Sequence, residues 1–559
     1  MSLARVPKNG KVAVLGGGIS GLSFAYFLSK LRPDVKIDLY EKSGRVGGAI
    51  NSQTLHSQDS DILLEKGPRT LRGVSNGTLL IVDILKALKK ENVIQVIPKN
   101  SPANKKYLLN QSNELVQVPD GIRTFSSFLS KSGIFTPELV FGILREPFRK
   151  GVKDGRDESI EEFFTRRFGN TVLTDKVLSA IMHGIYAGDT AKLSVNTILP
   201  GLKDTETKSG SVIRGMFSKL WTSKKKKTES KGAGSAENKS EFPESLVQYE
   251  QIISPSANLS ALSEQLKQFP MIKLQGGLQQ LPQTIFEELK KSPNFNVNFD
   301  SHITEVDPIV GKVTSSAHGK QSVLEYDHIN STIDSKALAS VLPEGSTALN
   351  EFKSALSTLE FASIFLVNAY SKSGCLIPKG KQGFGFLSPK FTKKIDSNPN
   401  ALLGIIFDSD VEKHAKYLIS NSGEAPDSGY SKITLMIGGH YYNQFQIPSN
   451  SRNLKIVKKI LAEILQLKVD NYNLIIRDEA LISDKTLPSL GPNDILISYN
   501  LYEDCIPQYN VGYGLNKKRV CDSLKELDCK MSIGGTSFGS GIGVPDCVVN
   551  GLENALNVK

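Results

Sequence analysis

A short apolar run followed at once by a glycine-rich turn constrains this chain of 559 residues more than any other feature. Residues 11–15 (KVAVL) predict a buried strand, residues 16–21 read Gly-x-Gly-x-x-Gly, and residues 22–29 carry apolar side chains at helical spacing. In this pattern one glycine permits the turn, one lets the backbone approach a pyrophosphate, and one lets the helix pack against the sheet. The predicted phosphate-binding residues are Gly16, Gly17, Gly18, Ile19, Ser20 and Gly21.

An acidic residue and a second glycine pair follow the turn at the spacing of a cofactor site. Residues 36–40 predict a second strand that ends at Glu41, where a carboxylate can accept hydrogen bonds from both hydroxyls of an adenosine ribose. The segment after this acid contains, in order, Lys42, Arg45, Gly48 and Ala49. The whole run resembles the extended fingerprint of the two-dinucleotide-binding-domain flavoproteins, and that resemblance favours FAD over free NAD.

A glycine-rich turn near residue 540 supports the same interpretation. A strand is predicted at residues 531–533, a turn over 534–543 and a helix over 547–556. In the flavoproteins that the chain resembles, such an element places helix N–H groups near the pyrimidine side of the flavin. The matching residues are Gly541, Ile542, Gly543 and Val544. Residues 276–333 look like the returning half of the FAD domain, with Ile303 at the position of a backbone contact to adenine.

Composition excludes several classes of protein. A chain of 559 residues exceeds the size of one hydrophobic core, and 39% hydrophobic with 22% charged residues argues against wholesale disorder and against a polytopic membrane protein. The net charge of +11 suits an anionic membrane or substrate, and no fold motif supports nucleic-acid binding.

Five scattered cysteines without C-x-x-C argue against disulfides and against a metal site. We expect no secretory signal, and the basic start is too short for a removable transit peptide.

Two basic segments allow more than one interpretation. Residues 203–249 contain Lys224–Lys227 and few large apolar residues, which predicts a flexible surface insertion. Its lysines could serve an anionic lipid or nuclear import, or could simply be solvated. Residues 121–150 mix aromatic, aliphatic and basic side chains, which suits either a helical surface in the headgroup region of a membrane or ordinary core helices with exposed cations.

Six further fragments resemble one family. In chain order they are Leu64–Thr70, Met182–Asp189, Gly383–Leu387, Leu403–Ser409, Met436–Gly439 and Cys505–Tyr509. Together they resemble the oxygen-dependent protoporphyrinogen oxidases, of the mitochondrial fungal type, within the FAD amine oxidase and phytoene desaturase superfamily. The resemblance implies noncovalent FAD and the oxidation of protoporphyrinogen IX to protoporphyrin IX with three O₂ reduced to H₂O₂, the penultimate step of heme biosynthesis.

The resemblance also implies an architecture and a location. The expected α/β fold has a Rossmann-like FAD domain (1–88, 250–340 and 481–559), a helical membrane-binding and channel domain (89–202), the flexible insertion (203–249) and an α+β substrate domain (341–480). The implied place is the surface of the mitochondrial inner membrane, as a peripheral, monotopic protein. A handover of product to ferrochelatase and a homodimer are both compatible with this family.

The implied substrate site needs apolar walls and a cation, because the macrocycle is apolar and carries two propionates. By resemblance, Leu387 and Ile406 sandwich a pyrrole ring, Met436 packs beside them, Phe384 supports the wall, and the carbonyl of Gly184 faces a pyrrole N–H. Relatives often have an arginine for a propionate where this chain has Lys106. The segment containing Gly67, Pro68, Arg69 and Thr70 is expected near the flavin, and Arg69 could hold a carboxylate there.

No side chain is predicted to be an indispensable catalyst, because the flavin accepts the hydride and the protein orients the substrate. His183 and His440 are the candidates against this view. One alternative is another amine oxidase or desaturase of the same fold. The other is a non-enzymatic lipid-binding escort like the Rab GDP-dissociation inhibitors, which would lack flavin absorbance.

Overall fold

The FAD-type domain is built from segments far apart in the sequence. A computed structural model describes residues 5–120, 122–151, 155–218, 242–390, 401–419, 429–482 and 484–559. Its central sheet is parallel, in the order β10 (Phe295–Asn298), β2 (Lys36–Tyr40), β1 (Lys11–Leu15), β14 (His328–Ser331) and β22 (Met531–Ile533). The predicted strand, turn and helix at the start of this domain are therefore confirmed.

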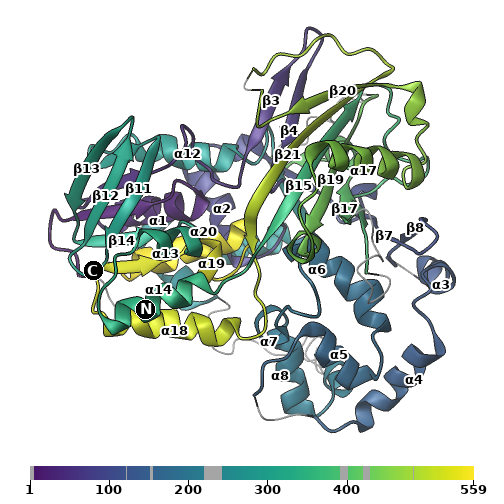
Figure 1. The fold of residues 1–559 in the computed structure, drawn as a ribbon, viewed down its shortest axis with the longest axis horizontal. Coiled ribbons are helices and arrows are strands. Elements are labelled where there is room, and N and C mark those ends of the chain that lie inside the picture. Colours follow the sequence, from purple (N-terminus) through teal and green to yellow (C-terminus); the bar gives the residue numbers. More distant parts are fainter. Residues whose placement is uncertain are drawn as a thin grey trace.

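Helices cover one face of this sheet and a second sheet covers the other (Figure 1, left). The helices of the first face are α1 (Ile19–Leu31), α2 (Asn76–Ala87), α11 (Leu259–Leu266), α12 (Gln280–Leu289) and α20 (Val544–Leu556). The other face carries β11 (Ser301–Asp307), β12 (Lys312–Ala317), β13 (Lys320–Glu325), α13 (Ser335–Val341), α14 (Thr347–Ser357) and α18 (Tyr513–Glu526). The fold class predicted from the sequence, a Rossmann-like α/β domain with inserted parts, is confirmed.

An eight-stranded mixed sheet forms the second unit (Figure 1, upper right). Its order is β20 (Asn473–Asp478), β21 (Asp494–Pro507), β15 (Phe361–Ser371), β19 (Ser431–Gly439), β17 (Leu402–Ile406), β16 (Gly385–Leu387), β7 (Lys106–Leu109) and β8 (Leu115–Gln117). α16 (His440–Gln444) and α17 (Asn450–Glu463) pack on it. Placing all of residues 89–202 in a helical domain was wrong, because residues 106–117 extend this sheet by pairing with β16. Two other predicted boundaries were also wrong: β21 belongs to this sheet and not to the FAD domain assigned to 481–559, and α14, assigned to the substrate domain over 341–480, packs on the FAD-type domain.

Two small sheets connect the units. One contains β18 (Lys416–Tyr417), β6 (Ile94–Ile97), β9 (Met271–Leu274) and β5 (Leu71–Arg72), and the other is the hairpin of β3 (Ser52–His56) and β4 (Asp61–Glu65). Residues 94–97 were also assigned to the helical domain, and they instead pair with β9 next to the core of the FAD-type domain.

A group of helices lies below the eight-stranded sheet (Figure 1, lower right). It contains α3 (Ile122–Lys131), α4 (Pro137–Arg145), α5 (Ile160–Phe168), α6 (Ser179–Tyr186), α7 (Val195–Ile198) and α8 (Pro200–Ser209). Its small apolar core includes Ile160, Phe163, Phe164, Met182 and Val212. No helix in the described ranges is long and apolar enough to cross a membrane.

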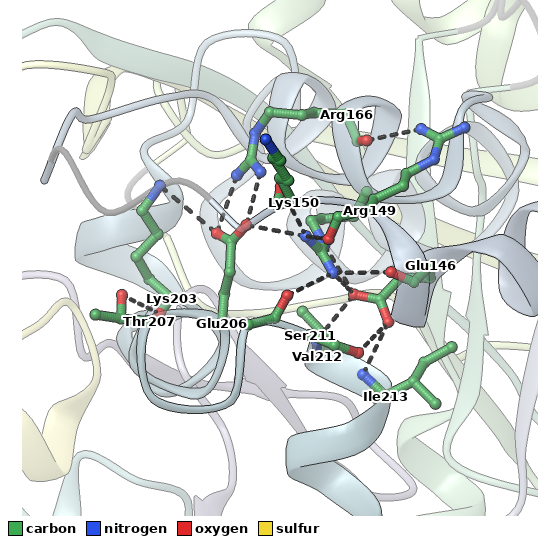
Figure 2. A network of polar contacts seen from close by, with 12 residues as sticks. Glu146, Arg149, Lys150, Arg166, Lys203, Glu206, Thr207, Ser211, Val212 and Ile213 are labelled. Atoms are coloured by element: carbon green, nitrogen blue, oxygen red, sulfur yellow. Dashed lines mark hydrogen bonds and ion pairs between the residues drawn. The ribbon is translucent and has the colours of Figure 1, made fainter.

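Buried charges hold these helices together (Figure 2). The fully buried Arg167 of α5 pairs with Glu146 and Glu206, neighbouring Arg166 pairs with Glu158 and Glu206, and Lys203 pairs with Glu158. Three cations thus face three carboxylates, so the network is neutral. A buried ion-pair network needs this balance, because an unpaired buried charge is strongly destabilising.

The expectation of a flexible insertion over residues 203–249 was wrong at both ends. Lys203–Ser209 belong to α8, residues 212–218 form another helical segment, and α10 (Glu244–Gln248) leads into the buried Tyr249. The composition gave no sign of this order because buried ion pairs, and not apolar residues, fix the first part. Residues 219–241, including Lys224–Lys227, lie outside the described residues.

Candidate active site

The glycines after β1 leave a cradle that side chains would fill. Gly16 has φ +103°, and a Cβ on Gly21 would lie 2.1 Å from the Gly16 carbonyl oxygen, so both positions require glycine. A Cβ on Gly18 would meet only the Cα of Gly48, at 3.8 Å, and a β-bridge joins Gly18 to Gly47. Two glycine turns therefore face each other across an open space at the N-terminus of α1, which fits the pyrophosphate of FAD.

The carboxylate of Glu41 lies beside this cradle, as predicted for a ribose-binding acid. Its Oε2 accepts a hydrogen bond from the Gly17 N–H at 2.8 Å, and its Oε1 accepts from the main-chain N–H and hydroxyl of Ser43. Ser301, at the start of β11, donates its N–H to the Glu41 carbonyl. Ile303 follows two residues later, and its contact with adenine stays a prediction.

Arg45 stiffens the second glycine turn. Its guanidinium donates to the carbonyls of Val46, Gly48 and Ile50, and burial lowers its pKa. Lys42 and Ala49 are exposed on either side of it. The cation of Arg45 therefore belongs to the turn that faces the cradle, and its contact with a pyrophosphate stays a prediction.

The C-terminal glycine turn faces the same space. It includes α19 (Gly535–Phe538) and leads into α20, whose first turn holds Asp546 with its carboxylate on the Gly543 N–H at 3.1 Å. A Cβ on Gly541 would lie 2.4 Å from that carboxylate, so a side chain there would displace it. Lys517 of α18 donates to the Gly539 carbonyl. Ile542, between the two glycines, lines the cavity described next.

A cavity of about 1400 Å³ extends from this turn to the group of helices. Ala49, Gly67, Pro68, Thr70, Thr536 and Ile542 line its flavin side, and Leu139, Ile143, Phe168, Ile213, Met216 and Phe217 line its helical side. The seven residues predicted to bind substrate, Arg69, Lys106, Gly184, Phe384, Leu387, Ile406 and Met436, all line it between these two sides. The structure thus brings them together, and their individual contacts with a substrate remain predictions.

Leu387 and Gly184 are in close contact in this wall. A Cβ on Gly184 would lie 2.8 Å from a methyl group of Leu387, so glycine is what allows α6 to approach β16. Leu387 pairs with Gly404 of β17, two residues before Ile406. The strands thereby align Leu387 and Ile406 on neighbouring parts of one apolar surface.

Only three charged side chains line the cavity among the described residues, and all are cations. Lys66 is buried against Ser498 and Glu479, and burial lowers its pKa to about 8. Arg69 is paired with Asp408 at 2.7 Å. Lys106 is exposed at the start of β7 and makes no ion pair with the described part of the chain. It is therefore the one of the three that is free to meet an anionic group.

Two buried histidines beside the cavity form a fixed chain of hydrogen bonds. His183 Nδ1 lies 2.6 Å from the Ser388 carbonyl oxygen and must donate to it, so His183 Nε2 accepts from His440 Nε2 at 2.9 Å. His440 Nδ1 then accepts from Gln444 at 3.4 Å. Burial lowers the pKa of His183 to about 4 and that of His440 to about 3. Both nitrogens of His183 are engaged within the protein, so neither is available to a substrate.

Sequence reasoning missed Asp408 and the apolar side chains of the helical wall. Asp408 lies within the fragment Leu403–Ser409, yet it is 339 residues from its partner Arg69. The wall residues of α4, α5 and residues 212–218 carry only a general apolar signal. Their convergence on one cavity depends on tertiary packing that no local pattern specifies.

Comparison with known proteins gives a consistent result. Residues 19–479 match the family model described as flavin-containing amine oxidoreductase. The chain is 35% identical to protoporphyrinogen oxidase of Saccharomyces cerevisiae, over 100% of this chain and 99% of that protein. It is 29% identical to protoporphyrinogen oxidase of Schizosaccharomyces pombe, over 97% of each chain. A crystal structure of a protein from Exiguobacterium sp. 255-15 superposes with a TM-score of 0.65 at 17% identity, covering 98% of each chain.

Proposed function

Because this chain belongs to the flavin-containing amine oxidoreductases, and within them to the protoporphyrinogen oxidases, we propose that it oxidises protoporphyrinogen IX to protoporphyrin IX. The observation that carries this proposal is an apolar cavity of about 1400 Å³ that runs from the flavin-side residues Ala49 and Ile542 to Lys106, a cation without an ion pair among the described residues. A porphyrinogen is a large apolar macrocycle with two carboxylates, and this cavity offers the matching surface and charge.

FAD fits the two glycine turns, and when bound it supplies a hydride acceptor that O₂ can reoxidise. Each round removes two electrons and two protons from the substrate and reduces one O₂ to H₂O₂. Three rounds convert the porphyrinogen to the porphyrin, so three O₂ are consumed and three H₂O₂ are released for each substrate.

The protein's own groups bind and orient the macrocycle in this proposal. Leu387 and Ile406 contact a pyrrole ring, and Met436 and Phe384 complete that apolar wall. Lys106 pairs with a propionate, and the main-chain carbonyl of Gly184 accepts a hydrogen bond from a pyrrole N–H. No Asp or Glu lines the cavity among the described residues, and the ring nitrogens of His183 are both occupied. Rate acceleration therefore rests on orientation in an apolar cavity and not on a carboxylate or histidine base.

The same proposal includes attachment to a membrane surface. Large apolar side chains are exposed on α3, on α4 and the turn after it, and on residues 212–218. The more exposed of them are Phe125, Phe141, Leu144, Phe148, Met216 and Phe217. Arg145, Arg149 and Lys150 lie among them in the sequence, a mixture that suits the headgroup region of an anionic bilayer. We place the protein at the mitochondrial inner membrane as a peripheral enzyme, with handover of product to ferrochelatase and a homodimer as further parts of the proposal.

Aerobic turnover tests the activity. The purified protein should show flavin absorbance, release its FAD on denaturation, and generate protoporphyrin fluorescence from protoporphyrinogen IX with three H₂O₂ per porphyrin. A flavoprotein that oxidises only amines or carotenoids would instead be another enzyme of this fold. A colourless protein that FAD cannot reconstitute would support a lipid-binding escort and would end the enzymatic proposal.

Vesicle binding tests the membrane part separately. The variant Phe141→Ser/Phe148→Ser should pellet less with vesicles containing anionic lipid than the unchanged protein does. The matched control is Val323→Ser/Leu324→Ser, which alters exposed apolar residues of β13 in the FAD-type domain. Equal pelleting of all three proteins would place the attachment elsewhere.

A further inference from the structure

The cavity end of α6 has a backbone conformation that needs support. Ala187 directly follows α6 and has φ 51° and ψ 29°, in the left-handed region that residues with a Cβ rarely adopt. The Ala187 N–H donates to the His183 carbonyl, which is the bond of an αL-type helix end, and the Gly188 N–H donates to the Met182 carbonyl. Such a conformation persists only where surrounding contacts enforce it.

Of four neighbouring main-chain carbonyls at this helix end, two accept hydrogen bonds from the described part of the protein and two do not. The Tyr186 carbonyl accepts a hydrogen bond from the side-chain amide of Gln508 at 2.8 Å, and the Ala187 carbonyl accepts one from the main-chain N–H of His440 at 2.7 Å. The carbonyls of Gly184 and Ile185 accept no hydrogen bond from the described residues, and both residues line the cavity. They are the unsatisfied acceptors that a helix C-terminus leaves.

Gln508 is itself rigidly held. It is 4% exposed, its side-chain nitrogen donates to the Ile506 carbonyl as well as to Tyr186, and its main-chain N–H donates to the Glu360 carbonyl. A Cβ at Gly188 would lie 2.6 Å from the Gln508 side-chain oxygen, so the amide and the turn after α6 are packed in close contact. Movement of this side chain would therefore move the helix end.

The next residue connects to the flavin side of the cavity. The Tyr509 hydroxyl donates to the Thr536 carbonyl at 2.6 Å, and Thr536 lies in α19 of the C-terminal glycine turn and lines the cavity. The Tyr509 ring stacks on Tyr513 with centroids 4.2 Å apart. The neighbouring residues Gln508 and Tyr509 thus hydrogen-bond to opposite sides of the same cavity: Gln508 to the end of α6 on the substrate side, and Tyr509 to Thr536 on the flavin side.

We propose that Gln508 is a positioning residue that, together with Tyr509, fixes the distance between the free carbonyls of Gly184 and Ile185 and the flavin-side turn at Thr536. The carbonyls then accept from pyrrole N–H groups while the carbon to be oxidised faces the flavin. This inference rests on the proposed function, because it assigns the N–H donors to a porphyrinogen.

Replacement of Gln508 tests it in the full-length, FAD-loaded protein. Gln508→Leu removes the donor and keeps most of the volume, and kcat/KM for protoporphyrinogen should fall about 3- to 10-fold, the range of one hydrogen bond. We expect kcat to fall and KM to rise together, because both orientation and binding depend on the carbonyls. Hydrogen–deuterium exchange at residues 187 and 188 should become faster while flavin absorbance stays unchanged. Gln283→Leu, on the exposed face of α12, is the matched control and should change none of these.

The outcomes separate the two proposals. If the unchanged protein fails to oxidise protoporphyrinogen, the proposed function is wrong. If it turns over normally and Gln508→Leu has the same kcat/KM, the positioning role is wrong and the function stands. If Gln508→Leu loses its flavin, Tyr509→Phe decides, since it removes one hydroxyl and keeps the ring. It should lower kcat with little change in KM, and an unchanged kcat would contradict the inference.

Discussion

The guanidinium of Arg69, which lines the cavity, donates to the carboxylate of Asp408 at 2.7 Å. The other carboxylate oxygen of Asp408 accepts from the Thr434 hydroxyl, and that hydroxyl accepts in turn from the Asn368 amide. Both charged groups are less than a tenth exposed. Arg69 therefore acts first as the partner of a buried carboxylate.

Removing Arg69 should destabilise the protein more than removing the pair. Arg69→Met leaves Asp408 buried without its cation, at a cost of about 3–5 kcal/mol in the free energy of unfolding. Arg69→Met/Asp408→Asn removes both charges and should recover much of that loss. Urea denaturation of the two variants measures the difference. Equal stability of the single and double variants would mean that Asp408 does not depend on Arg69.

Lys106 should control the affinity for the dianionic substrate and leave the chemical step alone. Lys106→Met removes the unpaired cation of the cavity, and KM should rise about 5- to 10-fold because a partly exposed ion pair is lost. The rate constant kcat should change little, since the lysine does not touch the reacting carbons. Lys106→Arg keeps the charge and is the control. A fall in kcat without a change in KM would contradict this role.

The balanced network of three cations and three carboxylates, part of which Figure 2 shows, should be sensitive to the loss of a single member. Arg167→Met leaves Glu146 and Glu206 short of a cation, and we expect a loss of about 3–5 kcal/mol in unfolding free energy. Lys290→Ala breaks an exposed pair with Glu287 on α12 and should cost no more than about 1 kcal/mol. Thermal and urea denaturation compare the two. Losses of similar size would show that the network is not held by charge balance.

Stability should fall in mild acid because of buried histidines. Burial lowers the pKa of His183 and His328 to about 4 and that of His440 to about 3, whereas the unfolded value is about 6.5. Below pH 6.5 the unfolded chain therefore binds protons that the folded protein does not, and each histidine costs up to about 2 kcal/mol at pH 5.

The urea midpoint at pH 5 should thus lie below that at pH 7.5. His328→Gln, in β14 and away from the cavity, should weaken this pH dependence. A midpoint that rises as the pH falls from 7.5 to 5 would contradict the assignment of neutral, buried rings.

The sequence was most informative where function requires a special backbone. Gly16, Gly18 and Glu41 could be assigned without a structure, because a phosphate-binding turn and a ribose-binding acid need those residue types at that spacing. The resemblance likewise identified the lining residues from Phe384 to Met436. By contrast, the pairing of β7 with β16 joins residues about 280 positions apart, and no local period encodes that contact.

The error over residues 203–218 has a clear physical origin. Lys203 and Glu206 look like solvent-exposed charges in the sequence, because charged residues are seldom buried. Here three carboxylates and three cations bury one another, a collective effect that cannot be recognised from any one of those segments. The same limit explains why Asp408 was not identified as the partner of Arg69.

The distribution of the FAD-type domain along the chain affects how the protein can be made. α1 packs along α20, and the contact is so close that a Cβ on Gly551 would lie 2.8 Å from the Phe24 main-chain nitrogen. While the ribosome is still translating the segments before residue 544, α1 can pack against α12 but lacks the helix that makes its most extensive contact. The contact between the first and the last helix of this domain therefore forms only after more than five hundred residues have been synthesised.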